Sequence, residues 1–188
     1  MPYDAIVLAG GRARRLGGID KPSQRIGVNT LLERVVAAVA DAEQVVVVGP
    51  HRTLAPGIRE VTWCRENPAG GGPVAAVAAG LPATTADIVV VLGADLPWVA
   101  PGVPHLVSAV PGAGVAALAD ATGRVNHLAA AWRRTTLAAA LAALPVVTGA
   151  AMRSLIGGIA VVRVGDDGGW GADCDTWDDV AAARARQH

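Results

Sequence analysis

One lysine, Lys21, stands among fifteen arginines in this chain, and it closes a glycine-rich segment that starts at residue 8. The segment reads Leu-Ala-Gly-Gly-Arg-Ala-Arg-Arg-Leu-Gly-Gly-Ile-Asp-Lys. A lysine supplies a compact, rotatable point charge, whereas an arginine supplies a wide planar fork. Gly10 and Gly11 can take positive φ and bring backbone N–H groups close to phosphate oxygens, with Arg15 and Lys21 neutralising the remaining charge. The segment therefore predicts a phosphate-binding turn, and an ordinary tight turn with a surface lysine is the alternative.

Two further segments carry carboxylates of the kind that hold a hard cation. Asp95 follows an apolar, strand-like run and is followed by Pro97, which fixes the exit of the chain. Asp173 and Asp175 are separated by one residue, so in an extended segment they face the same side. Oxygen ligands of this type suit Mg²⁺, and we expect Asp95 to hold the ion, with help from Asp173, Asp175 or both. Turn formation by Asp95 and helix capping by Asp175 or Thr176 are the structural alternatives.

A second glycine-rich loop, Glu66-Asn-Pro-Ala-Gly-Gly-Gly-Pro73, opens an expected helix. Its backbone could lie flat against a nucleotide base, with Glu66 accepting hydrogen bonds from guanine N1–H and N2–H₂. A flexible connector is the alternative for this loop. His127 lies near the second strand of an expected hairpin, and a structural role is favoured there over ligation of a metal.

Short β-branched runs alternate with alanine- and leucine-rich helical patterns, which predicts βαβ units and a largely parallel sheet. The expected strands cover residues 5–8, 44–48, 60–64, 88–92, 115–119, 128–132 and 160–164. The run 88–92 is apolar throughout, as is typical of a strand buried on both faces. Ligands of open α/β sheets gather at the carboxyl ends of the strands. The three candidate segments follow strands and should therefore meet at one edge of the sheet.

Polar residues mark the starts of the expected helices. Thr30 would cap a helix whose apolar residues recur at helical spacing from residue 31 to 39. Pro73 suits the first turn of a helix that reaches residue 81. Thr135 would cap residues 137–144, and Thr176 would form a capping box before residues 180–186.

Residues 120–123 read as a turn that joins two strands into a hairpin. The fold class that follows is α/β. We expect a single Rossmann-like, three-layer domain over residues 1–188, with a mostly parallel sheet and a small antiparallel hairpin.

The length, composition and net charge of the chain limit the classes of function that it could have. With 188 residues and 52% hydrophobic content, the chain can bury a sizeable core. Its formal net charge is zero, so no global field would hold nucleic acid or an anionic membrane. Four prolines interrupt the uncharged stretch 96–119, which therefore predicts no membrane span. Cys64 and Cys174 fit no metal-ligand spacing, and the first residues resemble no signal peptide, so a reduced, cytoplasmic location is expected.

Residues 8–21 are similar to the signature Leu-Ala-Gly-Gly-x-x-x-Arg-x-Gly-x-x-x-Lys of a nucleotidyltransferase superfamily, and the chain most resembles the molybdenum cofactor guanylyltransferase family. The resemblance extends to three other segments. Gly72-Pro73-Val-Ala is similar to the Gly-Pro-Leu-Ala helix start of that family. Ala94-Asp95-Leu-Pro97 is similar to its metal-binding Asp-x-Pro. Asp173-Cys-Asp175-Thr176 is similar to its terminal Asn-x-Asn/Asp-Thr.

The resemblance implies a nucleotidyltransferase fold and a division of labour among the site residues. The nucleotide would be lined by Leu8, Ala9, Gly10 and Gly11, with Glu66 at the base and Lys21 and Arg15 at the phosphates. Asp95, helped by Asp175, would hold Mg²⁺. The implied partners are GTP, a molybdopterin acceptor and, transiently, other proteins of cofactor biosynthesis.

The implied reaction is attack by the terminal phosphate of molybdopterin on the α-phosphorus of GTP, which expels pyrophosphate. This nucleophile is already ionised at neutral pH, so no general base is required. Catalysis then reduces to in-line positioning and neutralisation of negative charge by Arg15, Lys21 and the metal on Asp95.

Two departures from the family bear on the choice of base. The family commonly has Asp where Glu66 stands, and its frequent Asn after the second strand is replaced by the stretch Val-Gly-Pro-His ending at His51. Cytidylyl-, sugar-1-phosphate and phospholactate nucleotidyltransferases share the chemistry and are the alternative enzymes. A non-catalytic nucleotide-binding module is the alternative of another class, although the presence of both Lys21 and Asp95 favours an enzyme.

Overall fold

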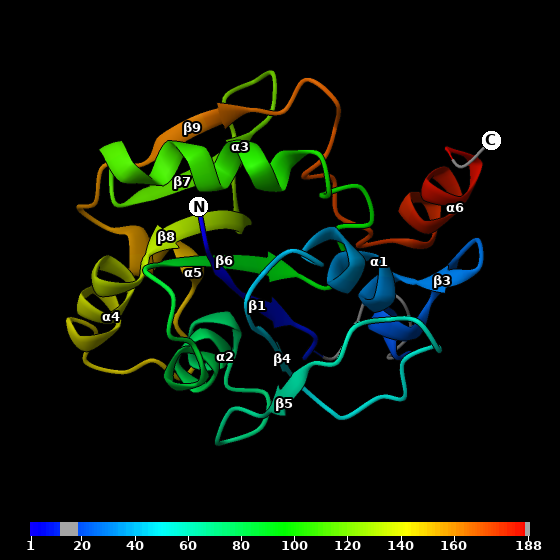
Figure 1. Ribbon diagram of the computed structural model, residues 1–188, viewed down its shortest axis with the longest axis horizontal. Helices are drawn as coiled ribbons and strands as arrows, with labels where there is room; N and C mark the ends of the chain where they lie inside the picture. The colour runs from blue at the N-terminus through cyan, green and yellow to red at the C-terminus, as the bar shows by residue number, and fades with distance from the viewer. Residues whose placement is uncertain (12–18, 187–188) are drawn as a thin grey trace.

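The β-branched runs form one seven-stranded sheet in the computed structural model, which describes residues 1–11 and 19–186 (Figure 1). The strand order is β5-β4-β1-β6-β8-β7-β9. The strands are β1 (Asp4–Leu8), β4 (Val45–Val48), β5 (Thr62–Cys64), β6 (Ile88–Gly93), β7 (Val115–Ala119), β8 (Val125–Arg133) and β9 (Val162–Gly165). The predicted Arg15 site lies outside the described residues.

The register explains why the candidate segments share an edge. β1 pairs in parallel with β4 on one side and with β6 on the other, so that Leu8 is opposite both Val48 and Gly93. The chain passes from β1 to β4 and β5 and then returns to β6 across β1, which makes the end of β1 the point where strand order reverses. Ligands of open α/β sheets bind at such points.

Antiparallel pairing enters the sheet through one strand. β8 lies between β6 and β7 and is antiparallel to both, while β7 and β9 are again parallel. The turn at residues 120–123 joins β7 to β8, as the sequence predicted. The mostly parallel sheet with a small antiparallel hairpin is therefore confirmed.

Helices cover both faces of the sheet because alternate residues of each central strand point to opposite sides. Ala5 and Val7 of β1 pack with α1 (Leu31–Ala38) and α3 (Gly102–Ala109). Ile6 and Leu8 pack with α2 (Pro73–Gly80), α4 (Arg134–Ala142) and α5 (Met152–Ile156). These two apolar layers around the sheet give the predicted three-layer α/β fold.

Capping residues set the ends of two helices as predicted. Thr30 Oγ1 accepts from the Glu33 N–H, and the Glu33 carboxylate accepts from the Thr30 N–H, which is a capping box at α1. Thr176 and Asp179 form the same arrangement at α6 (Trp177–Ala185). Such a cap contributes about 1 kcal/mol to helix stability.

Several local expectations were wrong or incomplete. Thr135 is not a cap, because α4 already begins at Arg134 and Arg133 occupies the capping position without a side-chain bond. The strand expected at 128–132 starts earlier, at Val125, because the hairpin turn is tight.

The sequence also missed α3, α5 and a second small hairpin between β2 (Arg25–Ile26) and β3 (Asn29–Thr30). No helix in the described part of the chain is long and apolar enough to cross a bilayer.

A buried carboxylate joins the strands at their amino ends, opposite the carboxyl ends where the candidate site residues lie. Asp4, at the start of β1, has no exposed surface. Its two oxygens accept hydrogen bonds from the backbone N–H groups of Gln44, Thr85 and Ala86, at 3.0, 2.6 and 2.8 Å. Gln44 precedes β4 and Ala86 precedes β6, so one side chain ties together the amino ends of three neighbouring strands.

Candidate active site

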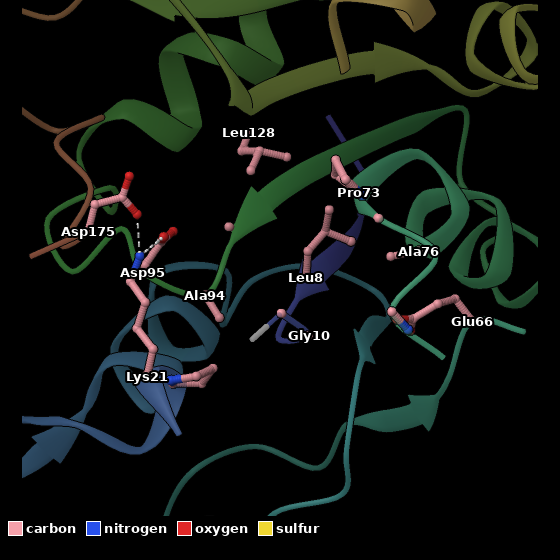
Figure 2. A pocket seen from close by; sticks show the side chains of 15 residues that line it. Leu8, Gly10, Lys21, Glu66, Pro73, Ala76, Ala94, Asp95, Leu128 and Asp175 are labelled. Atoms are coloured by element: carbon pink, nitrogen blue, oxygen red, sulfur yellow. Dashed lines mark hydrogen bonds and ion pairs between the residues drawn. The ribbon is translucent and has the colours of Figure 1, made fainter. Parts of the chain in front are cut away.

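Lys21 lies between two carboxylates at the carboxyl edge of the sheet. Its ammonium nitrogen is 2.5 Å from Asp95 Oδ2 and 2.7 Å from Asp175 Oδ1 (Figure 2). Only 13% of the Lys21 side chain is exposed, against 23% for Asp95 and 43% for Asp175. The three predicted residues come from widely separated parts of the sequence and meet at one point.

Backbone contacts place Asp95 and Asp175 side by side. The Ala94 N–H donates to the Leu8 carbonyl at 3.0 Å, which continues the β1–β6 pairing past the end of β6. The Cys174 N–H donates to the Asp95 carbonyl at 3.1 Å. A Cβ at Gly93 would lie 2.5 Å from Asp95 Oδ1, so the position of this carboxylate requires glycine there.

A second ion pair holds the chain just before Lys21. Asp20 accepts hydrogen bonds from Arg52 Nε at 2.8 Å and from Arg52 Nη2 at 2.5 Å. The Arg52 guanidinium is the first cause of the lowered pKa of Asp20. Lys21 then begins a short 3₁₀ turn, Lys21–Ser23, whose Pro22 is buried. Sequence reasoning missed Arg52, because nothing local indicates that it reaches Asp20.

The charges of the site are strongly coupled. Burial opposes the charged form of Lys21, but the carboxylates of Asp95 and Asp175 outweigh that effect and raise the pKa of its ammonium. Desolvation, followed by the negative charges of Asp175 and Asp95, raises the pKa of Asp173. Lys21 therefore stays protonated at neutral pH and compensates the two carboxylates that it contacts.

A cavity of about 570 Å³ opens beside this cluster. Its volume falls within the range of about 300–1,000 Å³ that is usual for small-molecule sites. The lining residues are Leu8, Gly10, Gly11, Lys21, Pro22, Glu66, Gly70, Gly72, Pro73, Ala76, Gly93, Ala94, Asp95, Leu128 and Asp175. Asp175 lines this cavity, whereas Asp173 lines a smaller one of about 160 Å³.

The predicted nucleotide-binding residues are distributed unevenly around this cavity. Ala9 is not among its lining residues, because its side chain packs in the apolar layer under α1 and α3. Gly11 has a φ of 118°, in the region that favours glycine, as predicted, whereas Gly10 does not have a positive φ. His127 is also absent from the lining, and burial lowers its pKa. Leu128 was not foreseen, since it enters only because β8 pairs beside β6.

Glu66 lies on the other side of Gly10 from Lys21 (Figure 2). It is only 8% exposed. Its Oε1 accepts from the Gly70 N–H at 2.9 Å, which folds the glycine-rich loop around the carboxylate. Its Oε2 is buried and has no hydrogen-bond partner among the described residues. An unpaired buried carboxylate oxygen is costly, so a ligand that donates hydrogen bonds here would be stabilised.

The donor set beside Lys21 fits Mg²⁺. Oxygens of Asp95 and Asp175 already converge on one cation, the ammonium of Lys21. Mg²⁺ usually binds one or two carboxylates and completes its coordination with water and substrate phosphates. Within residues 1–11 and 19–186, no group of three or more His, Cys, Asp or Glu side chains could hold a metal. The arrangement thus suits an ion shared between protein and ligand rather than one caged by the protein.

Residues 5–163 match the family described as the MobA-like NTP transferase domain. The chain belongs to this family. It is 32% identical over 135 residues to the molybdenum cofactor guanylyltransferase of Acidiphilium cryptum, a match that covers 68% of this chain and 65% of that protein. It is 37% identical over 105 residues to the probable molybdenum cofactor guanylyltransferase of Synechococcus elongatus, covering 53% and 54% of the two chains. The chain thus spans less than two thirds of the length of these relatives.

The fold of this MobA-like domain is shared with solved structures. The crystal structure of molybdopterin-guanine dinucleotide biosynthesis protein A from Archaeoglobus fulgidus superposes with a TM-score of 0.73. The superposition covers 98% of each chain at 22% sequence identity. This likeness establishes the nucleotidyltransferase-type fold, which confirms the predicted fold class.

Proposed function

We propose that this protein transfers GMP from GTP to the terminal phosphate of a molybdopterin acceptor, with release of pyrophosphate and dependence on Mg²⁺. The observation that carries the proposal is the polarity of the cavity. One end holds a cation, Lys21, between two carboxylates, and the other is lined by Glu66, whose Oε2 has no partner in the described part of the chain. A nucleoside triphosphate has the matching order of groups, with phosphates at one end and a base with N–H donors at the other.

The base end favours guanine. Glu66 Oε2 can accept one hydrogen bond, and Oε1 retains acceptor capacity beyond its bond from Gly70. Guanine presents adjacent N1–H and N2–H₂ donors on one edge, whereas cytosine presents no such pair. Gly10 lies beside this carboxylate, and a Cβ there would be 3.6 Å from Glu66 Oε1. Glycine at this position leaves the space that a flat base requires.

The phosphate end is assigned to Lys21, Asp95 and Asp175. The ammonium of Lys21 would neutralise the triphosphate and the departing pyrophosphate. Asp95 and Asp175 would hold Mg²⁺, which when bound neutralises phosphate oxygens and orients them for displacement. The backbone of Gly11, at positive φ, would approach the phosphates without a side chain in the way. Arg15, named by the sequence for the same task, lies outside the described residues.

The chemistry then requires little beyond orientation. The attacking phosphate is ionised at neutral pH, so no side chain has to remove a proton from it. Lys21 and the backbone of the loop after β1 would hold the triphosphate so that attack at the α-phosphorus is in line with the leaving pyrophosphate. The apolar wall formed by Leu8, Ala76 and Leu128 would exclude bulk water from one side of the nucleotide.

Nucleotide choice is tested by following pyrophosphate release with molybdopterin, using GTP or CTP in the presence of Mg²⁺. We expect release with GTP and little with CTP. Glu66→Gln keeps the shape of the side chain but replaces one acceptor by a donor. The KM for GTP should therefore rise by about tenfold or more, and the rate of pyrophosphate release with CTP should not increase. Preference for CTP by the wild type would refute the assignment of guanine.

The role of Asp95 is tested by Asp95→Asn, which keeps the shape and removes the charge. The rate of pyrophosphate release at saturating Mg²⁺ should fall by about a hundredfold. Asp167→Asn, on an exposed loop and not among the residues that line the cavity, removes the same charge and is the matched control. Equal rates for the two variants would remove Asp95 from the mechanism.

A further inference from the structure

A second cavity, of about 460 Å³, lies on the α1–α3 side of the sheet. It shares no lining residue with the nucleotide cavity. Its walls come from α1, from the loop that follows Asp95, and from the two ends of the segment that carries α6. The lining residues are Asn29, Arg34, Ala37, Ala38, Pro97, Trp98, Ala100, Pro101, Trp170 and Arg186.

Two guanidinium groups face one aromatic ring in this cavity. The Cζ atom of Arg34 lies 4.5 Å from the centroid of the Trp98 ring, and that of Arg186 lies 4.9 Å from it. Each contact is a cation–π interaction. Two groups of the same positive charge therefore lie close to one ring. Trp170 forms another wall and is itself stacked on His105, with ring planes 2° apart.

The hydrogen bonds that both guanidiniums donate go to neutral backbone carbonyls. Arg34 donates to the carbonyls of Pro97 and Ile26, at 3.3 and 3.1 Å. Arg186 donates to the carbonyls of Gly169 and Gly168, at 3.3 and 2.6 Å. These bonds leave further N–H groups on each fork available, because a guanidinium carries five donors.

Among the described residues, no acidic side chain lines this cavity, and the carboxylates of Asp173 and Asp179 line the smaller cavity of about 160 Å³ that shares Trp98 and Arg186 with it. Neither Arg34 nor Arg186 forms an ion pair in the part of the chain that is described. Asp179, on α6, is instead engaged with Thr176 in the capping box, and Arg186 is the C-cap residue of the same helix. Desolvation lowers the pKa of Arg34, so its charge is held where water stabilises it poorly.

We propose that this cavity binds a small organic anion with a flat apolar body and one carboxylate or phosphate group. The free N–H groups of Arg34 and Arg186 would bind the anionic group, since charge-assisted bonds to guanidinium are the strong ones. The ring of Trp170 and the alanine and proline side chains would contact the flat body, because guanidinium groups already lie over the Trp98 ring. This site is additional to the proposed nucleotide site and does not depend on it.

The test uses the ¹⁵N-labelled full chain and benzoate as the probe. The chain has five tryptophans, and the indole N–H resonance of each would be followed by NMR after assignment. Benzoate should shift the resonances of Trp98 and Trp170 and leave that of Trp177, which is 49% exposed on α6, in place. Benzyl alcohol, which lacks the charge, and acetate, which lacks the ring, should each bind at least about tenfold more weakly.

Variants distinguish the guanidiniums from general surface charge. Arg186→Met should weaken benzoate binding by about tenfold, and Arg34→Met should do the same if it folds. Arg184→Met is the matched control, because Arg184 is exposed on the same helix, bonds to the Arg25 carbonyl and lies outside the cavity lining. It should leave binding unchanged.

The outcomes separate this site from the nucleotide site. Saturating GTP with Mg²⁺ should leave the benzoate-dependent shifts in place, and a protein that binds no GTP should still show them. The proposal is overturned if neither Trp98 nor Trp170 responds, if benzyl alcohol or acetate binds as well as benzoate, or if Arg186→Met binds like Arg184→Met. Competition between GTP and benzoate would also overturn it.

Discussion

Replacing Lys21 by methionine should strengthen the binding of a divalent cation to the free protein. The ammonium of Lys21 lies within 2.5 and 2.7 Å of the two carboxylates proposed to hold the metal. A metal that binds Asp95 and Asp175 must therefore displace this internal cation. Methionine has a similar length and no charge, so in Lys21→Met the two carboxylates are left without the competing ammonium.

The size of the effect follows from the two ion pairs. Partly exposed pairs each contribute roughly 0.2–1 kcal/mol after solvent screening. The Asp175 side chain is 43% exposed, so its ion pair with Lys21 contributes less than the upper end of this range. Only the pair between Lys21 and Asp95 is assigned the upper end. A combined competition of about 1–1.5 kcal/mol corresponds to a Kd for the metal that is about five- to twelvefold lower in the variant.

Binding is measured with Mn²⁺ in place of Mg²⁺, without nucleotide, by the loss of the free-ion signal in electron paramagnetic resonance. This readout needs no catalytic turnover, in which Lys21→Met should be impaired. Arg52→Met is the matched control. It also removes one positive charge close to the site, but it contacts Asp20 and leaves Lys21 between its carboxylates.

The control should change Mn²⁺ affinity by less than about twofold at physiological ionic strength, because the Arg52 charge is already paired with Asp20 and contacts neither Asp95 nor Asp175. Equal or weaker Mn²⁺ binding by Lys21→Met than by the wild type would refute the reasoning. It would mean that the carboxylates need the ammonium to stay together, or that the metal binds elsewhere.

Four further predictions concern stability and reactivity. Asp4→Ala leaves three backbone N–H groups without their acceptor and should lower the free energy of unfolding by about 2–4 kcal/mol in urea; a change below about 1 kcal/mol would contradict this. Thr176→Ala removes the capping box of α6 and should lower the free energy of unfolding by about 1 kcal/mol, whereas Thr176→Ser should leave it unchanged. Burial opposes ionisation of Glu33, but hydrogen bonds from Thr30 and Ala55 prevail and lower its pKa. Its contribution is therefore complete above the unfolded value of 4.5 and is lost progressively as the pH falls from there through the lower folded value. The urea midpoint of Glu33→Gln should accordingly fall less than that of the wild type between pH 6 and pH 3. Burial first, then Asp95, raises the pKa of Cys174 to about 11, so an aromatic disulfide reagent at pH 8 should label it only after unfolding.

The convergence of the charged residues could be predicted from the sequence alone. Lys21, Asp95 and Asp175 each follow an expected strand, and the carboxyl ends of parallel strands share one edge. The register confirms the reason, because Leu8 is opposite Gly93 and the chain continues from there to Asp95. Strong local patterns, namely apolar runs and capping residues, were sufficient for this part of the fold.

Other features depend on contacts between distant residues. The insertion of β8 between β6 and β7 brings Leu128 to the cavity, and no local pattern specifies that strand order. The helix α3 contains a proline and follows others, so its sequence resembles a loop. The pairing of Arg34 and Arg186 over Trp98 joins residues from three parts of the chain, and only the packed structure shows it.

The Asp4 carboxylate affects where the fold can tolerate mutations. It aligns β1, β4 and β6 from the amino edge, and every loop that lines the nucleotide cavity leaves from the far edge. Mutations in those loops therefore act on a scaffold whose alignment is secured elsewhere. Libraries that randomise the loops should yield mostly folded proteins with altered ligand preference, whereas a single exchange at the start of the first strand should reduce the yield of soluble protein.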